Sequence, residues 1–360
     1  MIDVPQSRVD SRAEGDHRLS RPTVNDIARE AGVSLATVDR VLNARPGVRG
    51  KTITAVNDAI ARLGYVRDMA AANLARSRRY RMAVFLPDGG GQFVQTMADA
   101  LDEAAQQAAA TRTEMSLIRY PAGDTHSLAA LLARVNPDEV AGVALMAPET
   151  PVLRDAVRAL RARAVPVVAL ASDLPNAGCD HFVGIDSRAA GRTAGVLMGR
   201  FLGARPQRVA VLAETMLLRD AIERRRGFDE VLQADFPAVD VLPTLETHGA
   251  TEALRRGLAE VLSGTDIGGI YLLGSGHRAL TAALDGMGLL GRVVVIGHEL
   301  TEHSRSALQS GHIHAVIAQN PGHLARSTLR VLRAKADRAP IDAGQEQLRI
   351  DIVIRENLPA

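Results

Sequence analysis

Residues 23–43 constrain the fold of this chain more than any other segment. They read TVNDIAREAGVSLATVDRVLN, two short amphipathic segments joined by an Ala-Gly-Val turn. Gly32 gives the backbone freedom that a tight turn between helices needs, and Ser34 can cap the second helix. Apolar or methyl-bearing residues recur with helical spacing on both sides of the turn: Ile27, Ala28, Val33, Thr37, Val38, Val41 and Leu42. The pattern predicts a helix-turn-helix, whose second helix can enter the DNA major groove, although a hairpin in a helical bundle shares the same turn.

The distribution of charge favours the DNA-binding interpretation. Residues 18–81 hold 13 Arg or Lys against 5 Asp or Glu, whereas the whole chain carries a net charge of only +2. A basic segment on a mildly acidic remainder is typical of a polyanion-binding head attached to a body with another role. Aromatic residues make up 3% of the chain and Trp is absent, which argues against a platform for stacking single-stranded bases. Duplex DNA is therefore the expected partner.

From residue 23 onward the sequence resembles the lactose-repressor (LacI/GalR) family of bacterial transcription regulators. The motif above is followed by RPGVR, by TITAVNDAIARLGYVRD and by AAANLARSRRYRMAVFLP, in the family's order and spacing. The resemblance implies a recognition helix over residues 34–42, with Leu35, Ala36 and Arg40 where the family reads bases. Leu35 and Ala36 can offer only apolar contacts, whereas Arg40 could pair with guanine.

One residue of the recognition helix departs from the family pattern. Asp39 stands where the family usually has Ser, and a carboxylate near phosphates is repelled. It could turn to Arg40 or another Arg, or it could read a cytosine amino group. We expect the following residues to contact DNA: Thr23, Ser34, Leu35, Ala36, Thr37, Arg40, Asn43, Ala71, Leu74 and Ala75.

The segment after the third expected helix is Ala-rich. Residues 69–74 (MAAANL) favour a helix by propensity, and composition alone is consistent with a solvated connector. The resemblance implies instead a hinge helix, with Leu74 as a wedge in a minor-groove step. Ala71 and Ala75 are small enough for two such helices to meet across a dyad. A paired wedge implies a homodimer, or a higher oligomer, on a roughly palindromic operator.

The body of the chain alternates strands with helices. Near-continuous apolar runs separated by helical segments favour parallel sheets covered on both faces. The runs lie at 82–87, 115–118, 142–147, 166–171, 181–185, 209–213, 239–243, 269–273, 293–297 and 314–318. About 280 residues exceed one α/β core, so we expect two doubly wound lobes with a crossover near 170–190. The chain should return to the first lobe near its end and close on a strand in QLRIDIVIRENLP. This body resembles a type I periplasmic sugar-binding protein.

The expected domain organisation follows from these patterns. It comprises a disordered tail (1–20), a helix-turn-helix domain (21–67), a hinge helix or linker (68–80), and a two-lobed effector-binding and dimerisation domain (81–360). No apolar core precedes the helix-turn-helix, which indicates no secretory signal, and no run of 18 apolar residues suggests a membrane span. Cys179 is the single cysteine, which is typical of a reducing cytoplasm.

Ligands of paired doubly wound lobes bind at the carboxyl ends of the strands. A polar residue at a strand end can also be a simple helix cap, as Asp186 would be. The expected effector-binding residues are Gln92, Phe93, Asp173, Arg224, His277, His298, Glu299 and Gln319. Family resemblance implies effector contact for Asp173, Arg224, Glu299 and Gln319. The family usually has Asn or Asp at the positions of His277 and His298, and this difference leaves the effector's identity open.

Catalytic and metal signatures are not evident in the sequence. Neither a G-x-S-x-G elbow, an H-E-x-x-H motif nor a dinucleotide fingerprint occurs, so we expect no cofactor and no enzyme activity. His312 and His314 could share a strand face, but scattered histidines are the simpler interpretation, and we expect no metal. The sequence predicts a transcription regulator, expected to be a repressor, whose DNA binding is controlled by a sugar or polyol. The alternatives are a sensor or enzyme with an accessory basic head, or a regulator that answers to a nucleoside or a protein.

Overall fold

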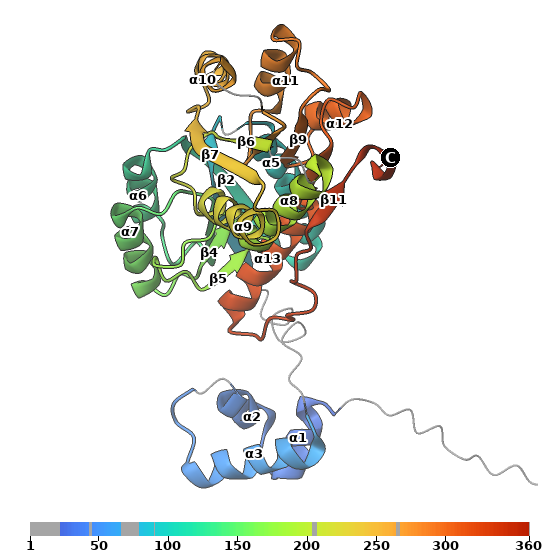
Figure 1. Ribbon diagram of the computed structural model, residues 1–360. Coiled ribbons are helices and arrows are strands. Elements are labelled where there is room, and N and C mark those ends of the chain that lie inside the picture. Colours follow the sequence, from blue (N-terminus) through green and yellow to red (C-terminus); the bar gives the residue numbers. More distant parts are fainter. Residues whose placement is uncertain are drawn as a thin grey trace, which may run out of the picture. The chain divides into compact units, whose positions relative to one another are not determined.

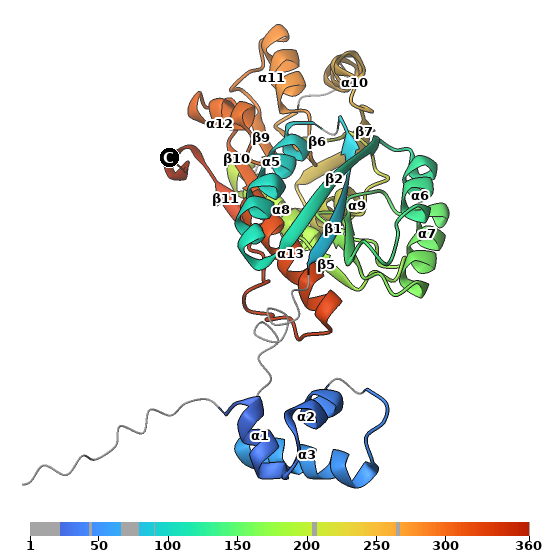
Figure 2. The same cartoon turned by 180° about the vertical axis from the view of Figure 1, so that it is seen from behind.

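The structure is a computed structural model (Figures 1 and 2). It describes residues 22–42, 45–65, 79–89, 91–203, 207–263 and 267–359. The chain separates into two compact units, Met1–Ser77 and Arg78–Ala360, here called the head and the body. Some predicted features lie outside the described residues: Asn43, Ala71, Leu74, Ala75 and the tail 1–20.

The head is a three-helix unit. Its helices are α1 (Val24–Ala31), α2 (Leu35–Leu42) and α3 (Gly50–Leu63). Ile27, Val38 and Val56, one from each helix, are completely buried against one another. The apolar stripe read from the sequence therefore forms the core of the head, and α2 is the helix expected over residues 34–42.

The first lobe of the body is a parallel sheet in the order β2-β1-β3-β4-β5. Its strands are β1 (Tyr80–Asp88), β2 (Thr113–Pro121), β3 (Gly142–Leu145), β4 (Val167–Leu170) and β5 (His181–Val183). Successive β1 residues point to opposite faces of the sheet, because side chains alternate along a strand. Val84 packs under α5 (Gly91–Ala108) and Phe85 under α6 (Thr125–Ala133) and α7 (Pro151–Ala162). Both faces are thus covered, as the near-continuous apolar strands predicted.

The second lobe repeats this plan. Its sheet has the order β11-β10-β9-β8-β6-β7, parallel except for the β10–β11 pair. The strands are β6 (Gln207–Ala213), β7 (Val239–Glu246), β8 (Gly269–Leu272), β9 (Val294–His298), β10 (Ala315–Ala318) and β11 (Asp351–Val353). Helices α8 (Ser187–Leu202) and α9 (Arg219–Asp235) cover one face. The other face is covered by α10 (Thr251–Ser263), α11 (His277–Gly286) and α12 (Glu302–Gln309).

The chain crosses between the lobes more than once. Helix α8 leads from β5 into the second lobe, and α13 (Pro321–Asp337) returns from β10 to pack against α5 and the first sheet (Figure 2). The chain then contributes β11 to the edge of the second sheet. The predicted fold class, with its crossover and its returning segment, is confirmed. Among the described helices, none combines the length and apolar character needed to cross a bilayer.

Candidate functional sites

The first helix of the head is fixed by its own cap. The Thr23 hydroxyl accepts from the Asp26 backbone N–H (3.4 Å), and the Asp26 carboxylate accepts from the Thr23 backbone N–H (2.8 Å) and hydroxyl (2.7 Å). These bonds from Thr23 hold the pKa of Asp26 below its ordinary value. Thr23, a predicted DNA contact, therefore has a structural role in the free protein.

The turn between α1 and α2 has the geometry that its sequence requires. Gly32 adopts a left-handed conformation (φ 64°), and its N–H bonds the carbonyls of the last turn of α1. The Ser34 hydroxyl accepts from the Thr37 backbone N–H (3.2 Å) and shares a hydrogen bond with the Thr37 hydroxyl (2.9 Å). Ser34 and Thr37 thus set where the second helix begins.

The outer face of α2 carries the predicted base-reading residues. Leu35 is 50% exposed although it is a large apolar side chain, and Ala36 and Arg40 are exposed as well. Ala36 and Arg40 are four residues apart, so they share one helix face. Ala36 and Arg40 lie opposite the buried Val38, and the exposed Leu35 lies at the start of the same helix, so this surface is able to contact base edges.

The departure at Asp39 has a local explanation. Its carboxylate forms an ion pair with Arg45 (Oδ2 to Nη1, 3.3 Å). Of the alternatives that the sequence left open, the free protein therefore shows the pairing with another Arg. Both side chains are about half exposed, so this pair contributes little stability, about 0–1 kcal/mol.

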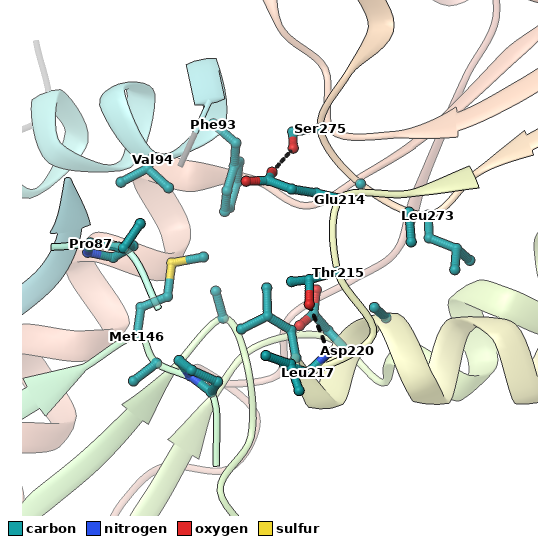
Figure 3. Close-up of a pocket in the computed structure, with 18 of the residues that line it drawn as sticks. Pro87, Phe93, Val94, Met146, Glu214, Thr215, Leu217, Asp220, Leu273 and Ser275 are labelled. Atoms are coloured by element: carbon teal, nitrogen blue, oxygen red, sulfur yellow. Dashed lines mark hydrogen bonds between the residues drawn. The ribbon is translucent and has the colours of Figure 1, made fainter. Parts of the chain in front are cut away.

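In the body, a cavity of about 160 Å³ opens between the two lobes at the carboxyl ends of the strands. Figure 3 shows Val94 and Met146 on one side and Glu214 on the other. The first lobe contributes the end of β1, the segments that follow β2, β3 and β4, and the start of α5. The second lobe contributes the ends of β6, β8, β9 and β10 and the start of α9. This is the place that the topology of paired doubly wound sheets assigns to a ligand.

A buried polar cluster forms the second-lobe wall. Arg224 is 2%, Gln319 4% and Glu299 6% exposed. The Arg224 Nη2 and the Gln319 Nε2 both donate to Glu299 Oε1, at 3.1 Å and 3.0 Å. Arg224 Nη1 donates to the Leu273 carbonyl (2.7 Å) and lies 3.5 Å from Asp220 Oδ2. A buried ion pair with such partners costs desolvation energy, which suggests a role other than stability.

The two charged members of this cluster respond differently to burial. Burial raises the pKa of Glu299 above its ordinary value, and Arg224 and the hydrogen bond from Gln319 oppose that rise. For Arg224, burial lowers the pKa, but the nearby carboxylates of Asp220 and Glu299 leave it raised overall. Arg224 is therefore a fixed cation, and Glu299 is the member whose protonation the surroundings can tune.

Several polar atoms of this wall have no hydrogen-bond partner within the described chain. They are Glu299 Oε2, Gln319 Oε1, Asp220 Oδ1 and Arg224 Nε. A buried acceptor without a partner costs about 1–3 kcal/mol. All four residues line the cavity, so a bound ligand is the natural partner for these atoms.

Backbone strain marks the same place. Glu299 (φ 72°) and Ala171 (φ 61°) are non-glycine residues in the left-handed region, each directly after the fourth strand of its lobe. Their N–H groups make equivalent bonds, Ala171 to the Val183 carbonyl (2.9 Å) and Glu299 to the Ile317 carbonyl (3.0 Å). Such conformations cost about 1–3 kcal/mol and cluster at functional sites. The strained turn directs both residues to the cavity.

Close helix packing positions Arg224. Helices α8 and α9 touch at glycines, because a Cβ on Gly191 would collide with the Arg224 carbonyl and a Cβ on Gly227 with the Arg188 carbonyl. Arg188 also forms an ion pair with Glu230 across this contact. The backbone of Arg224 is thereby held against α8, and its side chain extends to Glu299.

The first-lobe wall is mostly apolar. Pro87, Phe93, Val94 and Met146 line it, and the Tyr120 hydroxyl donates to the Met146 carbonyl (2.7 Å), which orders the loop after β3. Of the predicted effector residues, the structure brings together Phe93, Arg224, Glu299 and Gln319 around the cavity.

Asp173 was expected at the cavity, and the structure corrects this expectation. It does not line the cavity, and its Oδ1 accepts from the Leu174 backbone N–H (2.7 Å). Asp173 lies two residues beyond Ala171, as Thr301 lies two beyond Glu299, and Thr301 caps α12. The residue directly after the strand reaches the cavity, whereas the residue two positions later begins the next segment.

Gln92, His277 and His298 are also outside the residues that line the cavity. Gln92 is exposed. His298 is fully buried under the site, where its Nε2 lies 2.7 Å from the Tyr271 hydroxyl. His277 is buried against Gly297. Burial lowers the pKa of His277 to about 4 and that of His298 well below its ordinary value, so both are neutral core histidines at pH 7.

Two of the carboxylates that line the cavity were not among the predicted effector-binding residues. Asp220 lies one helical turn before Arg224 on α9, and this i, i+4 spacing was a signal that could have been read. Glu214 follows β6 and accepts a hydrogen bond from Ser275, which follows β8. Both of these strand ends were visible in the sequence, but nothing there showed that they meet. In the described part of the chain, no group of three His, Cys, Asp or Glu side chains could hold a metal ion.

Two family models match the chain. "Periplasmic binding protein domain" matches residues 82–339, and "Bacterial regulatory proteins, lacI family" matches residues 23–68. The solved structures resembling the body include a glucose-galactose binding protein from Geobacillus stearothermophilus (TM-score 0.70, 14% identity, 79% of this chain and 100% of that one). They also include a putative LacI transcriptional regulator from Bacteroides fragilis (TM-score 0.67, 19% identity, 78% of this chain and 98% of that one). At these identities the likeness shows the fold alone.

Curated relatives match over part of the chain. Catabolite control protein A of Priestia megaterium is 39% identical over 83 residues, which is 23% of this chain and 25% of that protein. The protein of the same name from Staphylococcus epidermidis is 39% identical over a stretch of the same length. The matched stretch thus spans about a quarter of these relatives. Taken with the helix-turn-helix head and the two-lobed body, these matches show that the chain belongs to the periplasmic binding protein domain family and carries a lacI-family DNA-binding domain at its head.

Proposed function

We propose that this protein is a cytoplasmic, homodimeric transcription repressor whose affinity for operator DNA is set by a sugar or polyol bound between the lobes of its body. The observation that carries the proposal is the buried Arg224–Glu299–Gln319 cluster. This cluster lines an interlobe cavity and holds acceptor atoms without a partner, in a chain that also has a lacI-family head. One such chain can bind both DNA and a small hydrophilic molecule.

The proposed DNA-binding role rests on the face of α2. Leu35, Ala36 and Arg40 are exposed together, and exposed cations surround them on the rest of the head. These cations are Arg29, Arg45, Arg49, Lys51 and Arg62. Phosphate contacts from such side chains position a helix-turn-helix, and base contacts from the recognition helix give its specificity. A dimer would place two such helices on the two half-sites of a palindrome.

The proposed effector role rests on linkage between the two sites. A ligand that bridges the lobes favours one closure angle of the body, and an operator that favours the same conformation must change effector affinity by the same factor. Several solved structures of this fold belong to sugar-binding proteins by their titles, among them one in complex with D-arabinose. A hydroxylated ligand suits Gln319, which can donate and accept.

Operator binding by the full chain tests the DNA half of the proposal. We expect selection from random duplexes to yield a palindrome. If about eight phosphates are contacted, log affinity should fall against log salt concentration with a slope of about −7. A protein that begins at residue 82 should lose this binding. Retention of specific binding by that shorter protein would contradict the assignment of the head.

A thermal-shift panel of sugars, polyols, nucleosides and amino acids tests the effector half. Gln319→Ala should abolish the operator response to the stabilising compound, with effector-free operator affinity kept within about threefold. Asp173→Ala is the matched control, because Asp173 is a strand-end polar residue outside the cavity. An unchanged response in Gln319→Ala would place the signal elsewhere, for example with a protein partner.

The alternative of an enzyme gains no support from the cavity. Its polar residues are an Arg, a Gln, a Ser, a Thr, a Tyr and three carboxylates. The buried histidines nearest in sequence to Glu299 and Ser275 lie outside the lining of the cavity. No described Ser or Thr hydroxyl in this lining contacts a histidine base, which is a common way of activating a hydroxyl nucleophile.

A further inference from the structure

The two walls of the cavity differ in chemistry. The charged residues that line the described part of the cavity all belong to the second lobe, and they are Glu214, Asp220, Arg224 and Glu299. Three carboxylates therefore face one guanidinium. The opposite wall, from the first lobe, is made chiefly of apolar side chains such as Phe93. A ligand that fits must present different chemistry to its two sides.

The polar wall needs hydrogen-bond donors. Asp220 Oδ1, Glu299 Oε2 and Gln319 Oε1 are buried acceptors without a partner in the described chain. Gln319 donates one of its two amide N–H groups to Glu299 Oε1, and its carbonyl oxygen is the atom without a partner. Acceptors of this kind are satisfied by hydroxyl or amino groups.

The single guanidinium of this wall is engaged through both of its Nη atoms, and only its Nε has no partner in the described chain. Arg224 donates to Glu299 and to the Leu273 carbonyl and lies beside Asp220. An anionic ligand would have to compete with these partners and would meet the remaining carboxylates at close range. Like charges repel strongly where water is excluded. A phosphate or carboxylate on the ligand is therefore disfavoured at this wall.

Helix ends do not reverse this preference. Helix α9 begins at the cavity, but Asp220 in its first turn already meets the positive end of that helix. The amino-terminal end of α5, which bears Phe93, carries the equivalent of about half a positive elementary charge. Full carboxylate charges on the facing wall outweigh it.

The apolar wall fixes the other side of the ligand. Phe93, Val94 and Met146 offer carbon surface to whatever sits against the polar cluster. A cavity volume of about 160 Å³ lies below the range of about 300–1,000 Å³ that is usual for drug-sized ligands. A single ring with polar groups on one side and C–H groups on the other matches both walls.

We infer that the effector is a small, ring-sized molecule that presents hydroxyl or amino donors to the second lobe and an apolar face to the first, and that its phosphorylated and carboxylated forms are rejected. This inference rests on the proposed function, in which the cavity is the effector site. The inference goes beyond the proposed function by assigning the charge of the effector, which is neutral or cationic and not anionic.

Matched series of compounds test it with the full-length protein. The glucose series has a neutral, an amino and a phosphorylated form, namely glucose, glucosamine and glucose 6-phosphate, and parallel series are built on galactose and ribose. Inositol and its monophosphate add a neutral and phosphorylated pair. Thermal shift and calorimetry give the affinities. We expect binding through a neutral or amino form, with the phosphorylated partner at least tenfold weaker. Tightest binding by a phosphorylated form would overturn the inference and leave the proposed function standing.

The remaining outcome separates the two claims. If no compound binds while operator binding persists, the sugar or polyol assignment in the proposed function fails, and the inference fails with it. Charge variants give a second measurement. Asp220→Asn combined with Glu299→Gln should reduce the discrimination against the phosphorylated form to below about threefold, because the repelling carboxylates are gone.

Two further variants complete the design. Glu214→Gln alters a half-buried carboxylate at the cavity rim, so it should fold even if the double variant does not, and it should weaken the discrimination in the same direction. Asp138→Asn removes an exposed carboxylate of the first lobe that does not line the cavity. Its discrimination should equal that of the unmodified protein. Unchanged discrimination in every cavity variant would contradict the electrostatic explanation.

Discussion

The Tyr80 hydroxyl donates to the carboxylate of Asp337, with both Oδ atoms at 2.8 Å. Tyr80 is the first residue of β1, where the described body begins, and Asp337 is the last residue of α13. At its other end, α13 starts directly after Gln319 and Asn320, and Gln319 lines the cavity. A helix of 17 residues is about 25 Å long. It therefore connects the interlobe cavity to the start of β1.

We predict that Tyr80→Phe uncouples effector binding from DNA binding. The variant loses a hydrogen bond to a charged group, worth about 1.5–3 kcal/mol, but keeps the buried ring. Effector affinity should stay within about twofold, while the effector's influence on operator affinity falls. Asp337→Asn should act in the same way, and the double variant should be no worse than either single one. Additive losses in that cycle would show that the two residues act independently.

We predict that Arg40→Ala relaxes sequence preference at one position of each half-site. The reason is the loss of an exposed side chain that can pair with guanine, at a cost of about 1–3 kcal/mol per pair. Binding to a set of single-base operator variants measures this directly. Arg62→Ala is the control, since Arg62 is exposed on α3 and pairs with Glu30 (3.1 Å). It should weaken all sequences alike, and equal loss of specificity in both variants would argue against a base contact by Arg40.

We predict that Leu74→Ala weakens operator binding and bending without changing the stability of the free protein. Leu74 lies outside the described residues, so the prediction rests on the resemblance of residues 69–74 to a hinge helix. A wedge residue contributes when it opens a base step. Thermal unfolding without DNA distinguishes it from a core residue, for which truncation costs about 2–5 kcal/mol.

We predict that His277 makes the body less stable as the pH falls from 6.5 to 4. Burial lowers the pKa of His277 from 6.5 to about 4, so in this window the unfolded chain takes up a proton that the folded protein does not. The contribution of His277 to the free energy of unfolding is therefore fully present above pH 6.5. It decreases by about 3 kcal/mol as the pH falls to 4. Urea unfolding over this range should show a shallower loss in His277→Gln. Equal pH dependence in both proteins would mean that His277 is not the group responsible.

The head could be predicted almost residue by residue, because its information is local. Gly32, Ser34 and the apolar stripe each act within a few positions, through a turn, a cap and one helix face. The strands of the body were also predictable, since buried parallel strands are continuous apolar runs. The antiparallel edge strand β11 was expected only as a closing strand, and its pairing with β10 depends on contacts far apart in sequence.

Half of the residues that the sequence predicted for the effector site line the cavity. Phe93, Arg224, Glu299 and Gln319 line the cavity, whereas Asp173 and His298 do not. Strand ends are visible in a sequence, but one residue of offset decides whether a side chain faces the cavity or the protein interior. His298 and Glu299 are neighbours, yet one packs against Tyr271 under the site and the other reaches Arg224.

The sequence by itself determined which segments are helices and strands, that the head is basic, and that the strands form two lobes. These properties depend on hydrophobic period, capping and composition, which are local quantities. The tertiary structure alone decided that Asp220, Arg224 and Glu299 meet, that Ala171 and Glu299 occupy equivalent strained positions, and that Tyr80 is bound to Asp337. Such contacts join residues up to 257 positions apart, and their geometry is fixed by the packing of whole helices and sheets.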